Sequence, residues 1–261
     1  MTSKILVGSE LDVTVVISCY NEENFIVNTI ENTIFALKNA DCSYELIVID
    51  DVSKDYSVDK VQAYIKLHPE YPITLKVNEI NRGLGNIYVE AAFLGKGKYY
   101  RLCCGDDSEP VEVLSRVFKK IGVADMVIPY QNQDEVVGKT PLRKLLSKTF
   151  TALVNGISGY NMKYYNGMAV HLRYNVLRWH ASSYGFGFQA DIITRLLDEG
   201  ASYIQIPSSS VDRKGSASSA MTLRNVLSVG HTLLELAIRR LRRYLYGHSS
   251  AKATEIFDEK A

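Results

Sequence analysis

Two adjacent carboxylates, Asp106 and Asp107, are the residues of this sequence best placed for chemistry. They follow an apolar run at residues 99–104, which predicts a buried strand that opens into a polar loop. In an open α/β sheet, the loops at the carboxyl ends of the strands border the ligand cleft. Paired carboxylates there favour a hard cation with oxygen ligands, Mg²⁺ or Mn²⁺. The alternative is a helix cap, because Asp107 or Ser108 could accept backbone N–H groups ahead of Pro110.

Three other strands are expected to end in polar loops. Apolar runs at residues 13–18, 45–50 and 73–78 predict strands covered on both faces of a parallel sheet. Helical segments alternate with them, which indicates right-handed βαβ units and an α/β fold with a mostly parallel sheet. The carboxyl ends of parallel strands meet at one edge, so these loops should gather there. They read Ser18-Cys19-Tyr20-Asn21-Glu22, Asp50-Asp51-Val52-Ser53-Lys54-Asp55 and Asn81-Arg82-Gly83.

Composition excludes several classes of protein. The 261 residues, 46% of them hydrophobic, are enough for one large core and exclude a disordered chain. There is no run of about 18 apolar residues, as a membrane span requires. Residues 1–9 lack the apolar region of a signal peptide, so a cytoplasmic location is expected. The four cysteines have no CxxC spacing, which predicts reduced thiols and no zinc site; they are Cys19, Cys42, Cys103 and Cys104.

The two halves of the chain carry opposite charge. Residues 1–135 hold 13 Lys and Arg against 21 Asp and Glu, whereas residues 136–261 hold 17 against 8. Between Glu135 and Asp191 there is no acidic residue. The second half is therefore expected to meet an anion, with nucleic acid, a phosphorylated substrate and a membrane surface as the candidates.

Two basic amphipathic helices are expected in the second half, at residues 141–157 and 223–246. Their apolar stripes and basic residues suit a peripheral position on the inner face of a membrane, with the cations on lipid headgroups. The alternative is that both stripes pack on the sheet or on a partner subunit. A Tyr-rich strand is expected near residues 164–172, and residues 247–261 are expected to form a flexible tail.

Taken together, the loops at the four strand ends resemble those of the family 2 inverting glycosyltransferases. These have the GT-A fold, a Rossmann-type open and mostly parallel sheet flanked by helices. The resemblance covers residues 12–220 and implies a glycosyltransferase domain at 1–220, with a nucleotide-sugar half up to about 135 and an acceptor half after it. It implies that these residues bind the nucleotide sugar: Ser18, Tyr20, Glu22, Asp50, Asn81, Arg82, Gly83 and Asp106.

The resemblance is imperfect at the metal motif. Asp106 matches the second Asp of the family's D-x-D motif, but Cys104 occupies the place of the first. A thiol is a poor ligand for Mg²⁺, which prefers oxygen. The resemblance therefore leaves Asp106 and Asp107 as the metal ligands, with the donor diphosphate supplying further oxygens.

The segment from Phe188 to Leu197 resembles the acceptor-side helix of polyprenyl-phosphate glycosyltransferases in the same family. Asp191 is then a candidate general base or acceptor-orienting carboxylate, and the alternative is an i,i+4 ion pair with Arg195. Arg213 is a candidate for stabilising the departing diphosphate, and the alternative is a surface arginine beside Asp212. Asp107 is the third catalytic candidate.

The expected function is metal-dependent transfer of one sugar, with inversion, from a UDP- or GDP-linked donor. The acceptor would be a polyprenyl phosphate or a saccharide, in cell-envelope glycan synthesis. Nucleic acid is not expected as a partner, and homo-oligomerisation is left open. One alternative is a catalytically silent nucleotide-sugar-binding protein of the same shape, favoured by Cys104. A cytidylyl-type nucleotidyltransferase is disfavoured, because no Gly-rich, basic loop follows the first strand.

His171 is expected to be a core or rim histidine.

Overall fold

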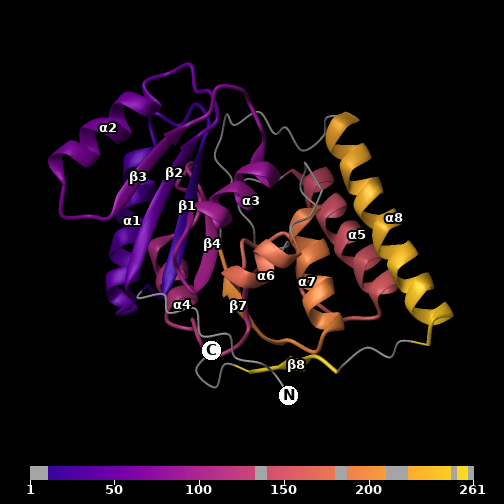
Figure 1. The fold of residues 1–261 in the computed structure, drawn as a ribbon. Helices are drawn as coiled ribbons and strands as arrows, with labels where there is room; N and C mark the ends of the chain where they lie inside the picture. Colours follow the sequence, from indigo (N-terminus) through magenta and orange to yellow (C-terminus); the bar gives the residue numbers. More distant parts are fainter. Residues whose placement is uncertain (1–10, 133–139, 180–186, 210–222, 248–251, 258–261) are drawn as a thin grey trace.

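The protein is built on one sheet of eight strands in the order β3-β2-β1-β4-β6-β5-β7-β8 (Figure 1). The computed structural model describes residues 11–132, 140–179, 187–209, 223–247 and 252–257. The strands are β1 (Val13–Cys19), β2 (Tyr44–Asp50), β3 (Ile73–Val77), β4 (Tyr99–Cys104), β5 (Met126–Gln131), β6 (Val170–Leu172), β7 (Ser202–Ser208) and β8 (Thr254–Glu255). The helices are α1 (Ile26–Asn39), α2 (Ser57–Leu67), α3 (Leu84–Leu94), α4 (Val111–Phe118), α5 (Pro141–Ser158), α6 (Arg173–Arg178), α7 (Phe188–Asp198) and α8 (Leu223–Leu245).

The strands of the first half are apolar on both faces, as predicted. In β1, Val13, Val15 and Ile17 pack in a core cluster with α1, α2 and α4. Val16, between them, belongs to a second cluster with α3, α5, α6 and α7. Successive residues of a strand point to opposite faces, so an unbroken apolar run requires a layer of helices on each. Strands β1 to β4 pair in parallel, and the predicted α/β class is confirmed.

A short antiparallel strand, β6, joins the two halves of the sheet. It pairs antiparallel with β4 on one side and with β5 on the other. β5 and β7 therefore run in the same direction as β1 and end at the same edge. The prediction of a strand near 164–172 was too long, because Tyr165 instead turns into the core, where its Oη donates to Asn155 Oδ1 at 2.8 Å. The short helix α6 was not predicted.

The prediction of a flexible tail is wrong for the part of it that the structure describes. Thr254 and Glu255 form β8, which pairs in parallel with the edge strand β7. Ile256 N–H donates to Tyr203 O at 2.8 Å, and Gln205 Nε2 donates to the Glu255 carboxylate at 2.7 Å. An edge strand has unpaired backbone groups, and this segment covers those of β7.

Candidate active site

The loops after β1 and β2 are held together by hydrogen bonds at the carboxyl edge of the sheet. Asn21 N–H donates to Ser53 Oγ at 2.8 Å, and Lys54 N–H donates to Asn21 Oδ1 at 2.7 Å. Asn21 has a left-handed backbone with φ of 57°, which Asn tolerates better than most residues. These bonds hold Tyr20, 50% exposed, and Glu22, half-buried, at the edge where the resemblance expects the nucleoside.

Asp50 ends β2 and is 1% exposed. Its Oδ1 accepts the N–H groups of Val52 at 3.1 Å and Ser53 at 3.0 Å. These bonds hold Val52 at a φ of 71°, a strained backbone for a β-branched residue. Its Oδ2 is also buried, and no residue in the described part of the chain donates to it. A buried carboxylate oxygen without a donor is costly, so this atom suits an N–H group of a bound ligand.

Asp51 positions the third loop, a role that we did not predict. The carboxylate is 3% exposed and accepts from Asn78 Nδ2 at 2.9 Å, Arg82 N–H at 2.8 Å and Gly83 N–H at 2.8 Å. Gly83 has a φ of 75°, which glycine adopts without strain. Asn81 and Arg82 are thereby presented at the surface beside β2. The only sequence signal for this role is the Asp50-Asp51 doublet itself.

The loop after β4 brings Asp106 next to the end of β1. Gly105 N–H donates to Ser18 O at 2.8 Å, and a Cβ at position 105 would lie 2.7 Å from that oxygen, so only glycine allows the approach. Asp106 Oδ1 accepts from Ser108 N–H at 3.2 Å. Asp107 has a φ of 50°, and its Oδ1 accepts from Asn32 Nδ2 on α1 at 2.7 Å.

The two neighbouring carboxylates thus accept hydrogen bonds from different partners, Ser108 and Asn32. The assignment of both carboxylates as metal ligands stays a prediction. No cluster of three or more His, Cys, Asp or Glu residues suited to a metal ion occurs in the described residues. Burial, followed by the charge of Asp106, raises the pKa of the Cys104 thiol well above its usual value. A protonated thiol does not ligate Mg²⁺. The residues fit a divalent cation only as a partial site, with Asp106 as the protein ligand and most oxygens from donor and water.

A buried arginine supports the same loop. Arg101 is fully buried within β4, and its Nη2 lies 2.6 Å from Glu109 Oε1. Its Nε donates to Met168 O at 3.0 Å. This pair ties the loop that carries Asp106 to the centre of the sheet. Sequence reasoning missed it, because an arginine inside an apolar run gives no sign of where its partner lies.

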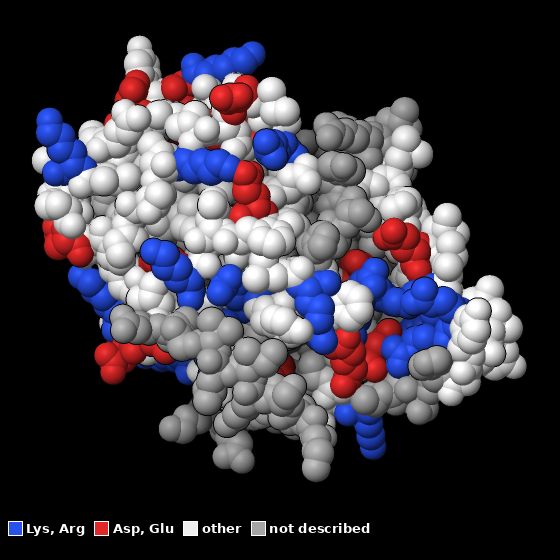
Figure 2. Space-filling model, in the orientation of Figure 1, with Lys and Arg blue, Asp and Glu red and all other residues white. Residues whose placement is uncertain are grey.

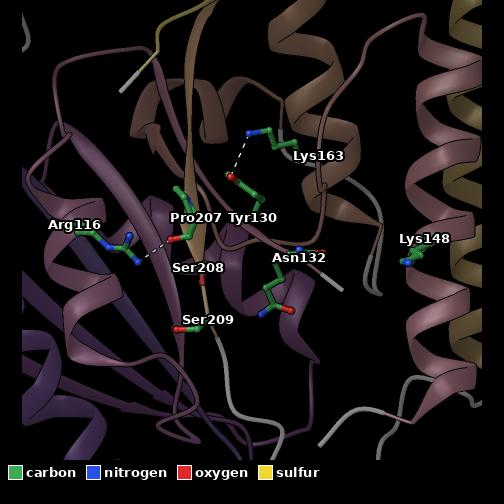
Figure 3. A pocket seen from close by; sticks show the side chains of 9 residues that line it. Arg116, Tyr130, Asn132, Lys148, Lys163, Pro207, Ser208 and Ser209 are labelled. Atoms are coloured by element: carbon green, nitrogen blue, oxygen red, sulfur yellow. Dashed lines mark hydrogen bonds between the residues drawn. The ribbon is translucent and has the colours of Figure 1, made fainter. Parts of the chain in front are cut away.

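A basic pocket of about 530 Å³ opens at the carboxyl ends of β5 and β7 (Figure 3). Arg116 Nη2 donates to Pro207 O at 2.9 Å, and Lys163 Nζ donates to Tyr130 Oη at 3.2 Å. Figure 3 shows Lys148 on α5 across the pocket from Arg116 on α4. No Asp or Glu is among the described residues that line it, which are Arg116, Tyr130, Gln131, Asn132, Lys148, Lys163, Pro207, Ser208 and Ser209. The expectation that the second half meets an anion has its best structural counterpart here.

Asp191, a catalytic candidate of the second half, does not line this pocket. Asp191 is 5% exposed and accepts from Arg195 Nε at 3.0 Å and from Arg239 Nη1 at 2.6 Å. The i,i+4 ion pair that was the alternative for Asp191 is therefore present, and the carboxylate is held in the interface between α7 and α8. Arg213 lies outside the described residues.

The prediction of a core or rim position for His171 is confirmed. His171 is fully buried beside Gln189, with 3.3 Å between His171 Nε2 and Gln189 Oε1. Burial lowers the pKa of His171 to about 4, so the imidazole is neutral at pH 7. All four cysteines are free thiols.

Comparison with known proteins agrees with this geometry. The chain is 30% identical to a dolichyl-phosphate β-glucosyltransferase of Dictyostelium discoideum over 109 residues, which are 40% of this chain and 33% of the relative. It is 25% identical to an undecaprenyl-phosphate 4-deoxy-4-formamido-L-arabinose transferase of Proteus mirabilis over 165 residues, 63% of this chain and 50% of the relative. The chain therefore spans between a third and a half of the length of these relatives.

A solved structure shows the same fold. Glucosyl-3-phosphoglycerate synthase from Mycobacterium tuberculosis, in complex with Mg²⁺ and UDP, superposes with a TM-score of 0.60 at 16% identity. The match covers 88% of this chain and 79% of that one. The family model described as Glycosyl transferase family 2 matches residues 14–183, well over half of the sequence. The chain belongs to glycosyl transferase family 2.

Proposed function

We propose that this protein transfers a sugar, with inversion, from a UDP- or GDP-linked donor to a polyprenyl phosphate or, as the second choice, to a saccharide. The observation that carries the proposal is the basic pocket at the sheet edge where Asp50 keeps a buried, unpartnered oxygen. That edge offers one position for a nucleoside and one for an anion. The names of the relatives support a lipid phosphate, since two of them act on dolichyl or undecaprenyl phosphate.

On the donor side, residues of the chain would bind the nucleotide sugar and orient it. Asp50 Oδ2 would accept an N–H of the base, and the loop shaped by Asp51 would place Arg82 beside the diphosphate. Asp106 would hold a divalent cation, whose chemistry is to neutralise charge on the leaving diphosphate. Arg213 is proposed to add a fixed positive charge for the same purpose.

On the acceptor side, the pocket cations would orient an anionic oxygen towards the anomeric carbon. A phosphate oxygen is already charged, so it attacks without a general base. This agrees with Asp191, whose carboxylate is engaged with Arg195 and Arg239. A neutral sugar hydroxyl would need a base, and we therefore place it second.

A second candidate function is nucleotide-sugar binding without turnover. It is favoured by the raised pKa of the Cys104 thiol and by the hydrogen bond between Asn32 and Asp107, which leave Asp106 as the better placed of the two carboxylates for a metal.

A donor panel followed by a transfer assay tests both functions. UDP- and GDP-linked sugars with Mn²⁺ are screened for thermal stabilisation, and about 2.7 kcal/mol is expected for a ligand at 100 times its Kd. The stabilising donor is then incubated with a polyprenyl phosphate and with the matching polyprenol. We expect product with the phosphate only. Stabilisation without product supports the silent binder, and no stabilisation by any donor contradicts both functions.

A further inference from the structure

The apolar stripe of α8 faces away from the protein. Its members are spaced seven, four, three and four residues apart, which places them on one side of a helix. Each is more than half exposed: Leu227 65%, Leu234 59%, Ile238 56%, Leu241 58% and Leu245 70%. Thr232 and Leu236, on the opposite side, are buried against the protein. In a helix packed in the usual way the apolar side is the covered one.

The inward side of α8 carries arginines as well as the buried Leu236. Arg240 Nη2 and Arg243 Nη1 lie 2.6 and 3.0 Å from the two oxygens of Asp198 on α7, and Arg239 contacts Asp191 at 2.6 Å. The two aspartates are 4% and 5% exposed. Three arginines of α8, Arg239, Arg240 and Arg243, therefore hold the helix on the protein rather than pointing to lipid headgroups. The helix is oriented by ion pairs that leave its apolar stripe outside.

The neighbouring helix α5 extends the exposed apolar surface. Leu142, Leu145, Leu146 and Leu153 are between 47% and 61% exposed, and α5 packs beside α8. Figure 2 shows uncharged surface at the outer margin of the lower part of α8, with both basic and acidic side chains next to it. A group of exposed apolar side chains of this kind marks a candidate interaction site.

The charge around this surface favours lipid over a second copy of the chain. α5 carries Arg143, Lys144 and Lys148 and no acidic residue. A self-complementary interface would bring these cations towards their own copies, whereas an anionic lipid surface would complement them. Two exposed tyrosines, Tyr244 and Tyr246, sit at the end of α8, and tyrosine is common at the membrane interface.

The same surface adjoins the candidate active site. Lys148 lines the basic pocket and lies on α5 one turn from Leu145. A bilayer seated on the apolar stripe would therefore present lipid headgroups next to the pocket cations. Among the described residues, no helix is both long enough and apolar enough to cross a bilayer.

We propose that the outward face of α5 and α8 docks on a lipid bilayer by inserting its leucine and isoleucine side chains among the lipids. This rests on the proposed function, because it supplies the route by which the pocket meets a lipid phosphate. An interfacial helix buries its apolar side at the headgroup boundary and keeps its charged side away from the lipid tails. Here Arg239, Arg240 and Arg243 are kept on the protein by Asp191 and Asp198, so apolar insertion should supply the binding that persists at high salt. The cations of α5 should add a smaller, salt-sensitive part on anionic lipid.

Vesicle co-sedimentation tests this mode of docking. The full chain is mixed with phosphatidylcholine vesicles, with and without phosphatidylglycerol, at low and at high salt. We expect binding to persist at high salt, and the pair Ile238→Glu with Leu241→Glu to lower the bound-to-free ratio at least about tenfold. The matched control is Phe35→Glu with Leu67→Glu, which changes two side chains, 57% and 74% exposed, on α1 and α2. It should bind as the unmodified protein does.

Two results would overturn the proposal. Binding that needs phosphatidylglycerol and vanishes at high salt would show headgroup attraction alone. A soluble dimer that ignores vesicles and dissociates in the Ile238→Glu and Leu241→Glu variant would assign the face to a second copy.

A transfer assay with a short, water-soluble prenyl phosphate separates this proposal from the proposed function. Loss of vesicle binding with retained transfer in the Ile238→Glu and Leu241→Glu variant supports docking as a step distinct from catalysis. Vesicle binding by a protein that transfers no sugar to either acceptor supports docking and contradicts the proposed function.

Discussion

Buried aspartates have different structural roles in the two halves of the molecule. In the first half, Asp50 and Asp51 accept backbone N–H groups and so shape the loops that border the candidate donor site. In the second half, Asp191 and Asp198 neutralise arginines and so orient a helix. The first arrangement builds a ligand site from loops, and the second builds a surface. The same residue type therefore indicates a function only once its partners are known.

The largest expected effect is on the free energy of unfolding, through the buried ion pairs of the second half. Asp198→Ala should lower the free energy of unfolding by about 3–5 kcal/mol, because it leaves Arg240 and Arg243 without their buried partner. Denaturant unfolding measures it. The control is Glu199→Ala, next in sequence, whose pair with Arg178 is about one-third exposed and should contribute no more than about 1 kcal/mol. Equal effects of the two substitutions would contradict the assigned role of Asp198.

The next prediction concerns pH. The folded-state pKa of His171 is about 4, below the 6.5 of the unfolded chain, so the unfolded state binds more protons between these values. The contribution of neutral, buried His171 to the free energy of unfolding is complete above pH 6.5. It falls as the pH decreases, by up to about 3 kcal/mol at pH 4. Urea unfolding between pH 4 and 7 measures the slope. His171→Gln should be less steep than the unmodified protein, and identical slopes would rule out this origin.

The third prediction compares kcat for substitutions of the two carboxylates in the loop after β4, Asp106 and Asp107. Asp106→Asn should lower kcat at least about 100-fold if Asp106 holds the metal that stabilises the leaving diphosphate. Asp107→Asn should change kcat less than about threefold, because that carboxylate contacts Asn32 instead. The measurement is transfer at saturating donor and Mn²⁺. A loss confined to Asp107→Asn would reverse the assignment.

The smallest expected effect is in the basic pocket. Lys163→Ala should raise the KM for a phosphate acceptor between about threefold and tenfold and leave donor binding unchanged, since one exposed charge is removed. Lys119→Ala, an exposed lysine at the end of α4 that does not line the pocket, is the control. If Lys163→Ala changed the Kd of the donor and left the KM of the acceptor unchanged, the pocket would be assigned to donor binding instead.

The sequence by itself determined the parallel half of the sheet and where its loops gather. Unbroken apolar runs require cover on both faces, and parallel strands end at one edge, so Asp50, Arg82 and Asp106 had to lie in loops at the same edge of the sheet. These are local patterns, and the structure bears them out for β1 to β4. The charge asymmetry predicts that the second half meets an anion, and two of the three cations that line the basic pocket, Lys148 and Lys163, come from that half.

Only the tertiary structure decided which partner each side chain takes. Helical spacing showed that α8 is amphipathic, but the choice of inward side depended on Asp191 and Asp198, far away in the sequence. In the same way, Asp107 accepts a hydrogen bond from Asn32 on α1, and Arg101 forms an ion pair with Glu109 in the loop after β4. An ion pair or hydrogen bond needs both partners in place, and the second partner is supplied by the fold rather than by the local sequence.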